Sequence, residues 1–251
     1  VIYTRIFKES DTVKDDPRII ALSKAFSIFL NERTIYIEDD QLIAGSFGRK
    51  PRAFPIYPET LGDTLVGQYR KLPTREIDRF EYSEEDRLVL EEKLHKWHGT
   101  GMYDYVFGDM PMYAKTLFLK NPDDLASGGT NIFSMEVPLN GPAGHTTPGY
   151  QTVLEIGFGG IKDKAKLRLE QAETEQDEEG INFLKAVIIC ADAITNFAHR
   201  YAKLAREKAS VETDGQRKQE LLTMAEACER VPGLPPRTFQ ECLQAVWFTF
   251  I

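Results

Sequence analysis

The sequence predicts an α/β fold that is mostly helical, and three observations support this. Apolar residues recur at helical spacing over two long stretches, 150–165 and 184–205. Thr238 and Glu241 form a capping box, which is typical of the start of a helix. In contrast, residues 35–47 have the composition of a strand or an extended segment around a turn.

Composition and charge narrow the class of protein. The chain has 251 residues, of which 42% are hydrophobic and 28% charged, with a net charge of -8. These values indicate a soluble, acidic, cytoplasmic protein with one large core or two small ones. No run of 18 apolar residues predicts a membrane span, and no signal peptide is visible. Nucleic-acid binding is not expected, because no basic stripe offsets the negative charge, and the cations of 162–168 alternate as on a solvated helix face.

The N-terminal elements follow in order. Residues 1–9 read as the tail of a helix, and Asp16 with Pro17 opens another, whose apolar stripe includes Ile20, Phe26 and Leu30. A turn at Asp39 and Asp40 divides the extended segment 35–47. Residues 51–58 contain three prolines and cannot form regular structure, so they are either a domain linker or an ordered loop over the core.

A capped helix is predicted from Ser83 to Trp97. It carries His95 and His98, whose spacing places both on one face as a possible metal pair. No carboxylate or cysteine completes a metal site in that segment, so aromatic surface contacts with Trp97 are the favoured interpretation. Residues 103–134 are rich in glycine, methionine and aromatics, and their structure is not assigned.

The second half of the chain is helical. Glycines 157, 159 and 160 lie inside the first helical pattern, which favours close helix packing over a nucleotide-binding loop. The acidic stretch 173–180 and residues 213–219 are expected to be exposed connections, and His199 a polar residue on a helix face.

A histidine precedes the helical pattern that starts near residue 150. In the stretch 140–150, Thr147 is the expected N-cap and Pro148 the first helical residue, so that the positive helix end would face the loop of His145. That field disfavours a protonated imidazole, and a neutral one can donate and accept a hydrogen bond to a small polar substrate. Alternatively, His145 is a turn residue bonded to a nearby carbonyl.

Four segments in order resemble a known family. They are the Gly-His stretch of 144–161; Glu38-Asp-Asp-Gln-Leu-Ile-Ala-Gly45 with Pro51-Arg-Ala-Phe-Pro-Ile-Tyr-Pro-Glu59; residues 183–206; and residues 225–248. Together they are similar to the N-terminal part of glycyl radical enzymes of the pyruvate formate-lyase superfamily. The Gly-His segment most resembles the dehydratase-like branch, which includes B12-independent glycerol dehydratase. The sequence departs from the pattern at Gly149, where an aspartate often precedes the tyrosine, and at Pro142 and Ala143.

The resemblance implies a fold and a chemistry. Residues 1–251 would be a partial pyruvate formate-lyase domain, truncated at both ends, that contributes part of a ten-stranded β/α barrel. His145 would hydrogen-bond a substrate hydroxyl. The family's thiyl Cys-x-Glu and its C-terminal Arg-Val-x-Gly-Tyr-like glycine, where a radical SAM activating enzyme installs the radical, do not occur here. No catalytic residue, metal or bound cofactor is therefore expected in the chain, which alone would be inactive; the whole enzyme is expected to be a homodimer.

Three functions remain open at this point. Radical C–O cleavage of a small diol-like substrate is favoured, because the His145 segment resembles the dehydratase-like branch. Decarboxylation or C–N cleavage in the same superfamily is the second, with His145 serving only shape. The third is a stand-alone helical binding module without catalysis.

The three cysteines and the C-terminal run are expected to be buried. Cys190, Cys228 and Cys242 lie in helical patterns that indicate core packing, and their odd number and wide spacing argue against disulfides, zinc and iron–sulfur sites. This usage fits a reducing compartment. Residues 245–251 are apolar almost all round, so this helix is expected to need burial, and the chain to be cut at Ile251.

Overall fold

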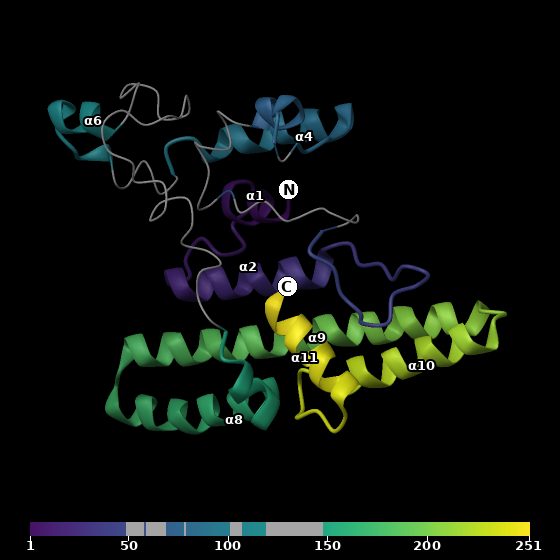
Figure 1. Ribbon diagram of the computed structural model, residues 1–251. Coiled ribbons are helices and arrows are strands. Elements are labelled where there is room, and N and C mark those ends of the chain that lie inside the picture. The colour runs from purple at the N-terminus through teal and green to yellow at the C-terminus, as the bar shows by residue number, and fades with distance from the viewer. Residues whose placement is uncertain (49–57, 59–68, 78, 101–106, 119–147) are drawn as a thin grey trace. The chain divides into compact units, whose positions relative to one another are not determined.

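The computed structural model describes residues 1–48, 58, 69–77, 79–100, 107–118 and 148–251. They fall into two compact units, one formed by Val1, residues 3–9 and 56–147, the other by Ile2, residues 10–55 and 148–251. All regular elements in the described ranges are helices (Figure 1). The mostly helical prediction is therefore confirmed, whereas the strands of the expected barrel are not seen in the described part of the chain.

The first unit contains short helices. They are α1 (Ile2–Lys8), the 3-10 helix η1 (Tyr69–Thr74), α4 (Glu84–Leu94), the 3-10 turn η2 (His95–Trp97) and α6 (Met112–Phe118). Ser83 caps α4 as predicted, because its Oγ accepts a hydrogen bond of 3.1 Å from the backbone N–H of Asp86.

Trp97 holds α1 against this unit. Its side chain is only 4% exposed, its Nε1 donates to Thr4 Oγ1 at 3.0 Å, and its ring meets Phe7 edge-on with centroids 6.2 Å apart. The predicted surface position of Trp97 was therefore wrong, since the indole is buried and paired with α1. Nearby, hydrogen bonds from Lys93 and Lys96 lower the pKa of Glu9 to about 2.

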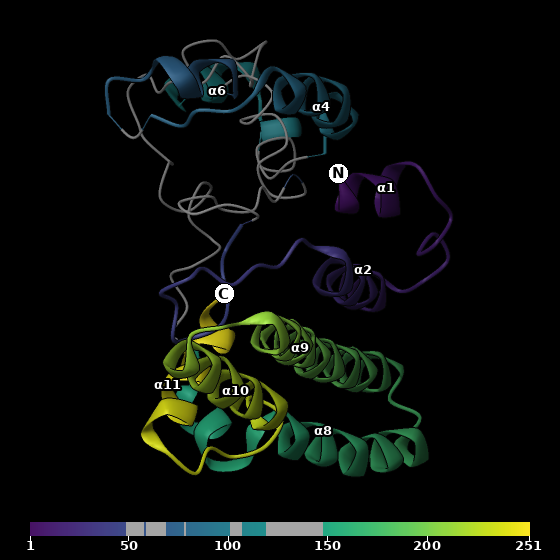
Figure 2. The ribbon, with the colours of Figure 1, turned by 90° about the vertical axis from the view of Figure 1, so that its right-hand side faces the viewer.

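The second unit is a bundle around one central helix. Its elements are α2 (Arg18–Glu32), α8 (Tyr150–Glu175), α9 (Glu178–Val211), α10 (Gly215–Arg230) and α11 (Phe239–Phe250). Helix α9 packs against α2, α8 and α10, as the two views in Figure 1 and Figure 2 show. A row of buried alanines along α9 lets these neighbours approach closely.

Aromatic residues fill the centre of this bundle. The rings of Phe197 and Tyr201 on α9 lie 5.2 Å apart, and each contacts Phe248 of α11, at 5.9 and 5.7 Å. Cys228 is fully buried in the same cluster, and burial raises the pKa of its thiol. Core packing is thereby confirmed for Cys228, while Cys190 and Cys242 are half-buried.

Two predicted connections are much shorter than expected. Helix α8 continues to Glu175, where Gln176 ends it in the left-handed conformation (φ 57°), and Asp177 caps α9 by accepting a 3.0 Å bond from Gly180 N–H. Most of 173–180 is therefore helical. Likewise, Asp214 accepts from Arg217 N–H at 2.8 Å and starts α10 within the predicted turn 213–219. Strong aspartate caps explain both corrections.

Helix α9 is long and apolar enough, by length and composition alone, to cross a membrane. A membrane span was not predicted from the sequence, because Lys185 and Asp192 interrupt the run of apolar residues in α9. In the described structure α9 packs against three other helices, which bury part of its apolar surface.

Helix α11 begins with the predicted cap. Thr238 Oγ1 accepts from Glu241 N–H at 3.2 Å, but the Glu241 carboxylate returns to the N–H of Arg237, at 2.6 Å, rather than to that of Thr238. The helix is packed on one face only: Ala245 and Phe248 are buried, whereas Phe239 is 77% and Phe250 54% exposed. The C-terminal helix was expected to be buried on all sides, but it is buried on one face and exposed on the other.

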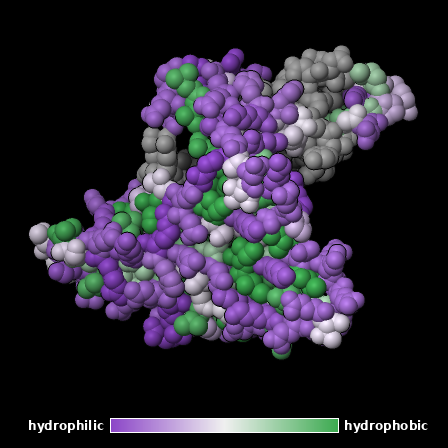
Figure 3. Space-filling model, turned by 180° about the vertical axis from the view of Figure 1, so that it is seen from behind, coloured by the Kyte–Doolittle hydropathy of each residue, from purple (hydrophilic) through white to green (hydrophobic). Residues whose placement is uncertain are grey.

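Further apolar side chains reach the surface of the bundle. Figure 3 shows hydrophobic residues gathered on its back face. Ile19 of α2, Leu167 of α8 and Phe183 of α9 are among the exposed large apolar residues of the described ranges. The cations of 162–168 face solvent as predicted, except that the half-buried Lys162 pairs with Asp192 of α9.

Candidate functional site

His145, the predicted substrate-binding residue, and Thr147, its predicted helix cap, lie outside the described residues. So do the prolines and glycines of its loop, most of the predicted loop 51–58 and most of 103–134. Pro148 is the first described residue after this loop, and its carbonyl accepts a 2.8 Å hydrogen bond from Tyr150 N–H. Helix α8 then begins at Tyr150 with Gly149 as N-cap, so Pro148 is not the first helical residue; the tight turn at its carbonyl delays the helix by two residues.

Helix α8 is broken about two turns further on, at Gly157. This residue has φ 66° and ψ 173°, a conformation that only glycine adopts readily. The break divides α8 into a short segment, 150–156, which follows the His145 loop, and a long segment, 158–175.

The long segment is anchored by a loop from elsewhere in the chain. A helix break leaves the next N–H groups without partners within the helix. Phe158 N–H donates to Pro232 O and Gly159 N–H to Gly233 O, both at 2.8 Å. Close packing at these glycines is confirmed, but the partner is the loop 231–234, not another helix. We call these contacts the Gly157 junction.

This junction changes the electrostatic argument for His145. The helix that follows its loop is an isolated segment of two turns, and the positive end of the longer segment faces the carbonyls of Pro232 and Gly233 instead. Because the field of a helix end is local and short helices supply little of it, the predicted bias toward a neutral imidazole loses most of its support.

A second feature of the bundle is the extended segment 33–47, held by side chains from three helices. Arg200 of α9 donates to Leu30 O and, at 2.8 Å, to Arg33 O. Lys208 of α9 donates to Ile37 O at 2.6 Å, and Arg217 of α10 to the carbonyls of residues 38 and 41 at 3.0 Å. The segment is therefore extended, with the turn at 39–40 as predicted, and cationic side chains take the place of a neighbouring strand.

Gln244 of α11 completes this support. Its amide accepts from Ala44 N–H at 2.7 Å and donates to Ala44 O at 2.8 Å, as a strand neighbour would, and the side chain is fully buried. Trp247 Nε1 donates to Gly45 O at 3.1 Å. Sequence reasoning missed Gln244, although an amide side chain among the apolar residues of α11 was a signal for a buried polar partner.

Tyr201 lies where this segment ends. Burial raises the pKa of its phenol, whose oxygen is 3.4 Å from Ser46 Oγ. The buried Arg33 donates to the carbonyls of Ser46 and Phe47 and stacks over the Phe197 ring. These contacts hold residues 38–47, which include the first part (38–45) of the second family-like segment; its second part, 51–59, lies outside the described residues except for Pro58.

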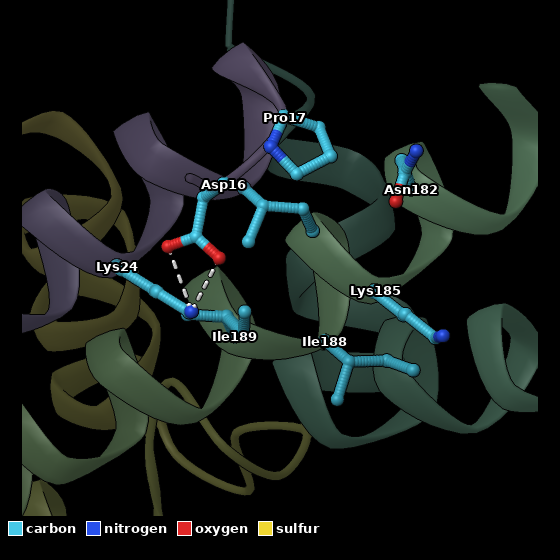
Figure 4. A pocket seen from close by; sticks show the side chains of 8 residues that line it. Asp16, Pro17, Lys24, Asn182, Lys185, Ile188 and Ile189 are labelled. Atoms are coloured by element: carbon cyan, nitrogen blue, oxygen red, sulfur yellow. Dashed lines mark hydrogen bonds and ion pairs between the residues drawn. The ribbon is translucent and has the colours of Figure 1, made fainter. Parts of the chain in front are cut away.

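An open groove of about 430 Å³ separates α2 from α9 (Figure 4). Asp16 and Lys24 form an ion pair along one side, with N–O distances of 2.7 and 2.8 Å, while Lys185 extends from α9 on the other side. Its floor is formed by isoleucines 20, 188 and 189. Its lining residues include no histidine or cysteine.

The other candidate histidines, His95, His98 and His199, lie on the protein surface. His95 and His98 are exposed, and in the described ranges no group of three or more histidine, cysteine or acidic side chains could hold a metal. His199 is exposed on α9, with Nε2 3.2 Å from Glu229 O, as expected for a polar face.

Comparison with known proteins identifies the class. The family model described as pyruvate formate lyase-like matches residues 1–251. The chain is 34% identical to an isethionate sulfite-lyase of Desulfovibrio desulfuricans, over 98% of this chain and 30% of that protein. It is 31% identical to a trans-4-hydroxy-L-proline dehydratase of Clostridioides difficile, over 100% of this chain and 30% of the other. The chain belongs to the pyruvate formate-lyase-like family, and its relatives are glycyl radical lyases and dehydratases.

A solved structure gives the same answer for the fold. The glycerol-bound B12-independent glycerol dehydratase of Clostridium butyricum matches with a TM-score of 0.86 and 29% identity, over 98% of this chain and 30% of that one. The chain thus spans about 30% of the length of the relatives it matches. It covers none of the C-terminal part in which those enzymes carry the glycyl radical.

Proposed function

We propose that this chain is the N-terminal part of a glycyl radical enzyme that cleaves a C–O bond of a small diol-like substrate. The observation that supports this most directly is the likeness to the glycerol-bound dehydratase over nearly the whole chain, with a TM-score of 0.86. Family membership also favours an enzyme over a stand-alone binding module.

In this proposal His145 binds the substrate. The rest of the polypeptide would supply the glycyl radical and the thiyl, which would abstract a hydrogen atom from the substrate. The neighbouring hydroxyl would then leave as water, with the proton that the remaining hydroxyl gives up, and the thiol would return the hydrogen atom to the product radical to give the aldehyde. The imidazole of His145 would hydrogen-bond a substrate hydroxyl and hold the substrate in one orientation. The hydrogen to be abstracted and the leaving hydroxyl would then stay in the positions that the reaction requires. We further propose a radical SAM activase as partner, a homodimer and a cytoplasmic location.

A second candidate is cleavage of a C–S bond in a hydroxylated sulfonate. It is favoured by one observation, the 34% identity to the isethionate sulfite-lyase. Decarboxylation and C–N cleavage have no comparable support in the relatives described above. A substrate panel for the activated full-length enzyme distinguishes the two candidates: glycerol and propane-1,2-diol would yield an aldehyde, and isethionate would yield sulfite.

The test of the site is His145→Ala in the activated full-length enzyme. Removing a hydrogen bond worth about 0.5–1.5 kcal/mol lowers kcat/KM for the diol about 2-fold to 10-fold, and further if a buried partner group is left unpaired. Steady-state kinetics with equal radical content in both enzymes measure this effect.

His95→Ala is the matched control, because His95 is an exposed histidine of the same chain. It should behave like the wild type. Equal kcat/KM for His145→Ala and the wild type would remove the substrate role of His145, and wild-type enzyme that turns over isethionate but no diol would replace dehydration by the second candidate.

A further inference from the structure

We propose that the exposed face of α11 is a docking surface for the rest of the full-length polypeptide, and that the segment covering it comes from beyond residue 251 of the same subunit. The inference rests on the proposal that this chain is the N-terminal part of a longer enzyme. It does not depend on which bond that enzyme cleaves.

Helix α11 has two faces on opposite sides of its axis. Successive residues of an α-helix are about 100° apart, so residues at spacings of three, four and seven share a face. One face is buried in the bundle and consists of Glu241, Gln244, Ala245 and Phe248. The opposite face consists of Phe239, Leu243, Val246 and Phe250. This second face is therefore entirely apolar and points away from the bundle.

The second face is exposed in the described structure. Phe239 is 77%, Leu243 44% and Phe250 54% exposed. The rings of Phe47 and Trp247 lie 5.4 and 5.8 Å from the ring of Phe250, so the apolar surface continues from α11 onto the extended segment. We call the four residues of the second face, together with Phe47, the outer face of α11. It contains no charged residue, so it fits an apolar segment.

The outer face differs from an exposed apolar residue that stands alone. Single apolar residues on a surface are common and need no partner. Leu167 of α8 is of this kind: it is 72% exposed, and its neighbours three and four positions away are polar and exposed, namely Asp163, Lys164, Glu170 and Gln171. At the same spacings Leu243 has three apolar neighbours, which are Phe239, Val246 and Trp247. The apolar residues of α11 thus form one continuous surface.

The size of the outer face and the length of the relatives indicate what covers it. The exposed parts of its side chains amount to on the order of 300–400 Å², whereas a stable interface between two proteins buries about 800 Å² per partner. The chain spans about 30% of the relatives it matches, so most of such an enzyme lies outside it. A small apolar surface is covered more readily by the same polypeptide, which is held at a high effective concentration, than by a second copy.

The first test is thiol modification in the full-length enzyme. Phe239→Cys and Leu167→Cys form a matched pair, because the two side chains are 77% and 72% exposed in this chain. We expect a maleimide to modify the Leu167→Cys variant at the rate of a free thiol, and position 239 of the other variant at least 10-fold more slowly. Tandem mass spectrometry distinguishes position 239 from Cys242. If Phe239→Cys does not fold, Phe250→Cys answers the same question.

The second test identifies the covering segment. Photo-reactive p-benzoylphenylalanine in place of Phe239 should form a cross-link at the mass of one subunit, to a peptide from beyond residue 251. Equal modification rates in the two cysteine variants, a product at the mass of two subunits, or a cross-link within residues 1–251 would overturn the proposal. Neither test involves turnover, so its failure is distinct from failure of the proposed function, which is seen in product formation.

Discussion

At the scale of single residues, Gln244 shows how one side chain can replace a strand. Its amide satisfies both backbone groups of Ala44, 200 positions earlier in the chain, in a fully buried setting. A buried donor or acceptor left without a partner costs about 1–3 kcal/mol, which exceeds the net gain from forming the same bond. Replacing Gln244 would therefore destabilise the fold mainly because the buried N–H and C=O groups of Ala44 would lose their partners.

We expect Gln244→Met to lower the free energy of unfolding by about 2–4 kcal/mol, because the volume is nearly kept while both groups of Ala44 lose their partners. Urea denaturation followed by far-ultraviolet circular dichroism measures the change. Gln219→Met, on the exposed face of α10, is the control and should shift stability by less than about 0.5 kcal/mol. A Gln244 variant as stable as this control would show that Ala44 finds other partners.

Residues of this kind also mark the limit of prediction from sequence. The apolar stripes of α2 and α9, the caps at Ser83 and Thr238 and the extended character of 35–47 depend on neighbours in the sequence, and they were predicted correctly. Gln244 depends on Ala44, and nothing local specifies that pairing.

At the scale of elements, the start of α11 combines a cap with an ion pair. The carboxylate of Glu241 accepts from Arg237 N–H at 2.6 Å and from its guanidinium at 2.7 Å, with Arg230 3.7 Å away. The bonds from the Arg237 side chain are the largest cause that lowers the pKa of Glu241 below 4.5. A carboxyl whose pKa is lower in the folded state stabilises the fold above its unfolded pKa, and this stability is lost as the pH falls through the folded value.

Glu241→Gln should therefore lower the free energy of unfolding by about 1–3 kcal/mol at neutral pH, since hydrogen bonds to a charged group are lost. Below pH 4.5 the difference between variant and wild type should shrink, because the wild-type carboxyl becomes neutral as well. Urea midpoints measured from pH 7 to pH 3 follow this. Glu170→Gln on the exposed face of α8 should leave stability unchanged, and a Glu241 effect that stays constant with pH would contradict the assignment to charge.

The break in α8 shows why an element can be located from sequence while its shape cannot. Periodicity predicted a helix through Gly157, and helical residues do lie on both sides of it. The conformation of Gly157 depends on the carbonyls of Pro232 and Gly233, which approach from a distant loop. The family was predicted correctly, whereas the substrate role of His145 stays a prediction, and the helix-dipole argument made for it relied on a continuous helix.

At the scale of the whole molecule, the described chain contains a helical bundle and a smaller helical unit. The radical chemistry of the family also requires a thiyl cysteine and a radical-storing glycine. The thiyl Cys-x-Glu and the glycine of an Arg-Val-x-Gly-Tyr pattern do not occur in the sequence. Cys228 does not supply this pattern, because Arg230 stands two positions after it, where the pattern has glutamate.

The 251-residue chain treated with an activase and S-adenosylmethionine should therefore show no glycyl radical signal by electron paramagnetic resonance and no turnover of diol or isethionate. The full-length enzyme prepared in parallel should show both. A radical doublet from the 251-residue chain would mean that one of its own glycines stores the radical, against the sequence pattern of the family.

The contacts that hold the extended segment 33–47 determine which of its positions can vary in sequence. Arg200, Lys208 and Arg217 all recognise it through backbone carbonyl oxygens, which every amino acid possesses, proline included. Related proteins can therefore differ in the side chain of an exposed position such as 38 without losing the carbonyl acceptor, whereas replacing any of the three cations removes a donor. Positions 37 and 41 are constrained in addition by their side chains, because Ile37 is buried in the core and the Gln41 amide donates to Ile43 O and Gly45 O.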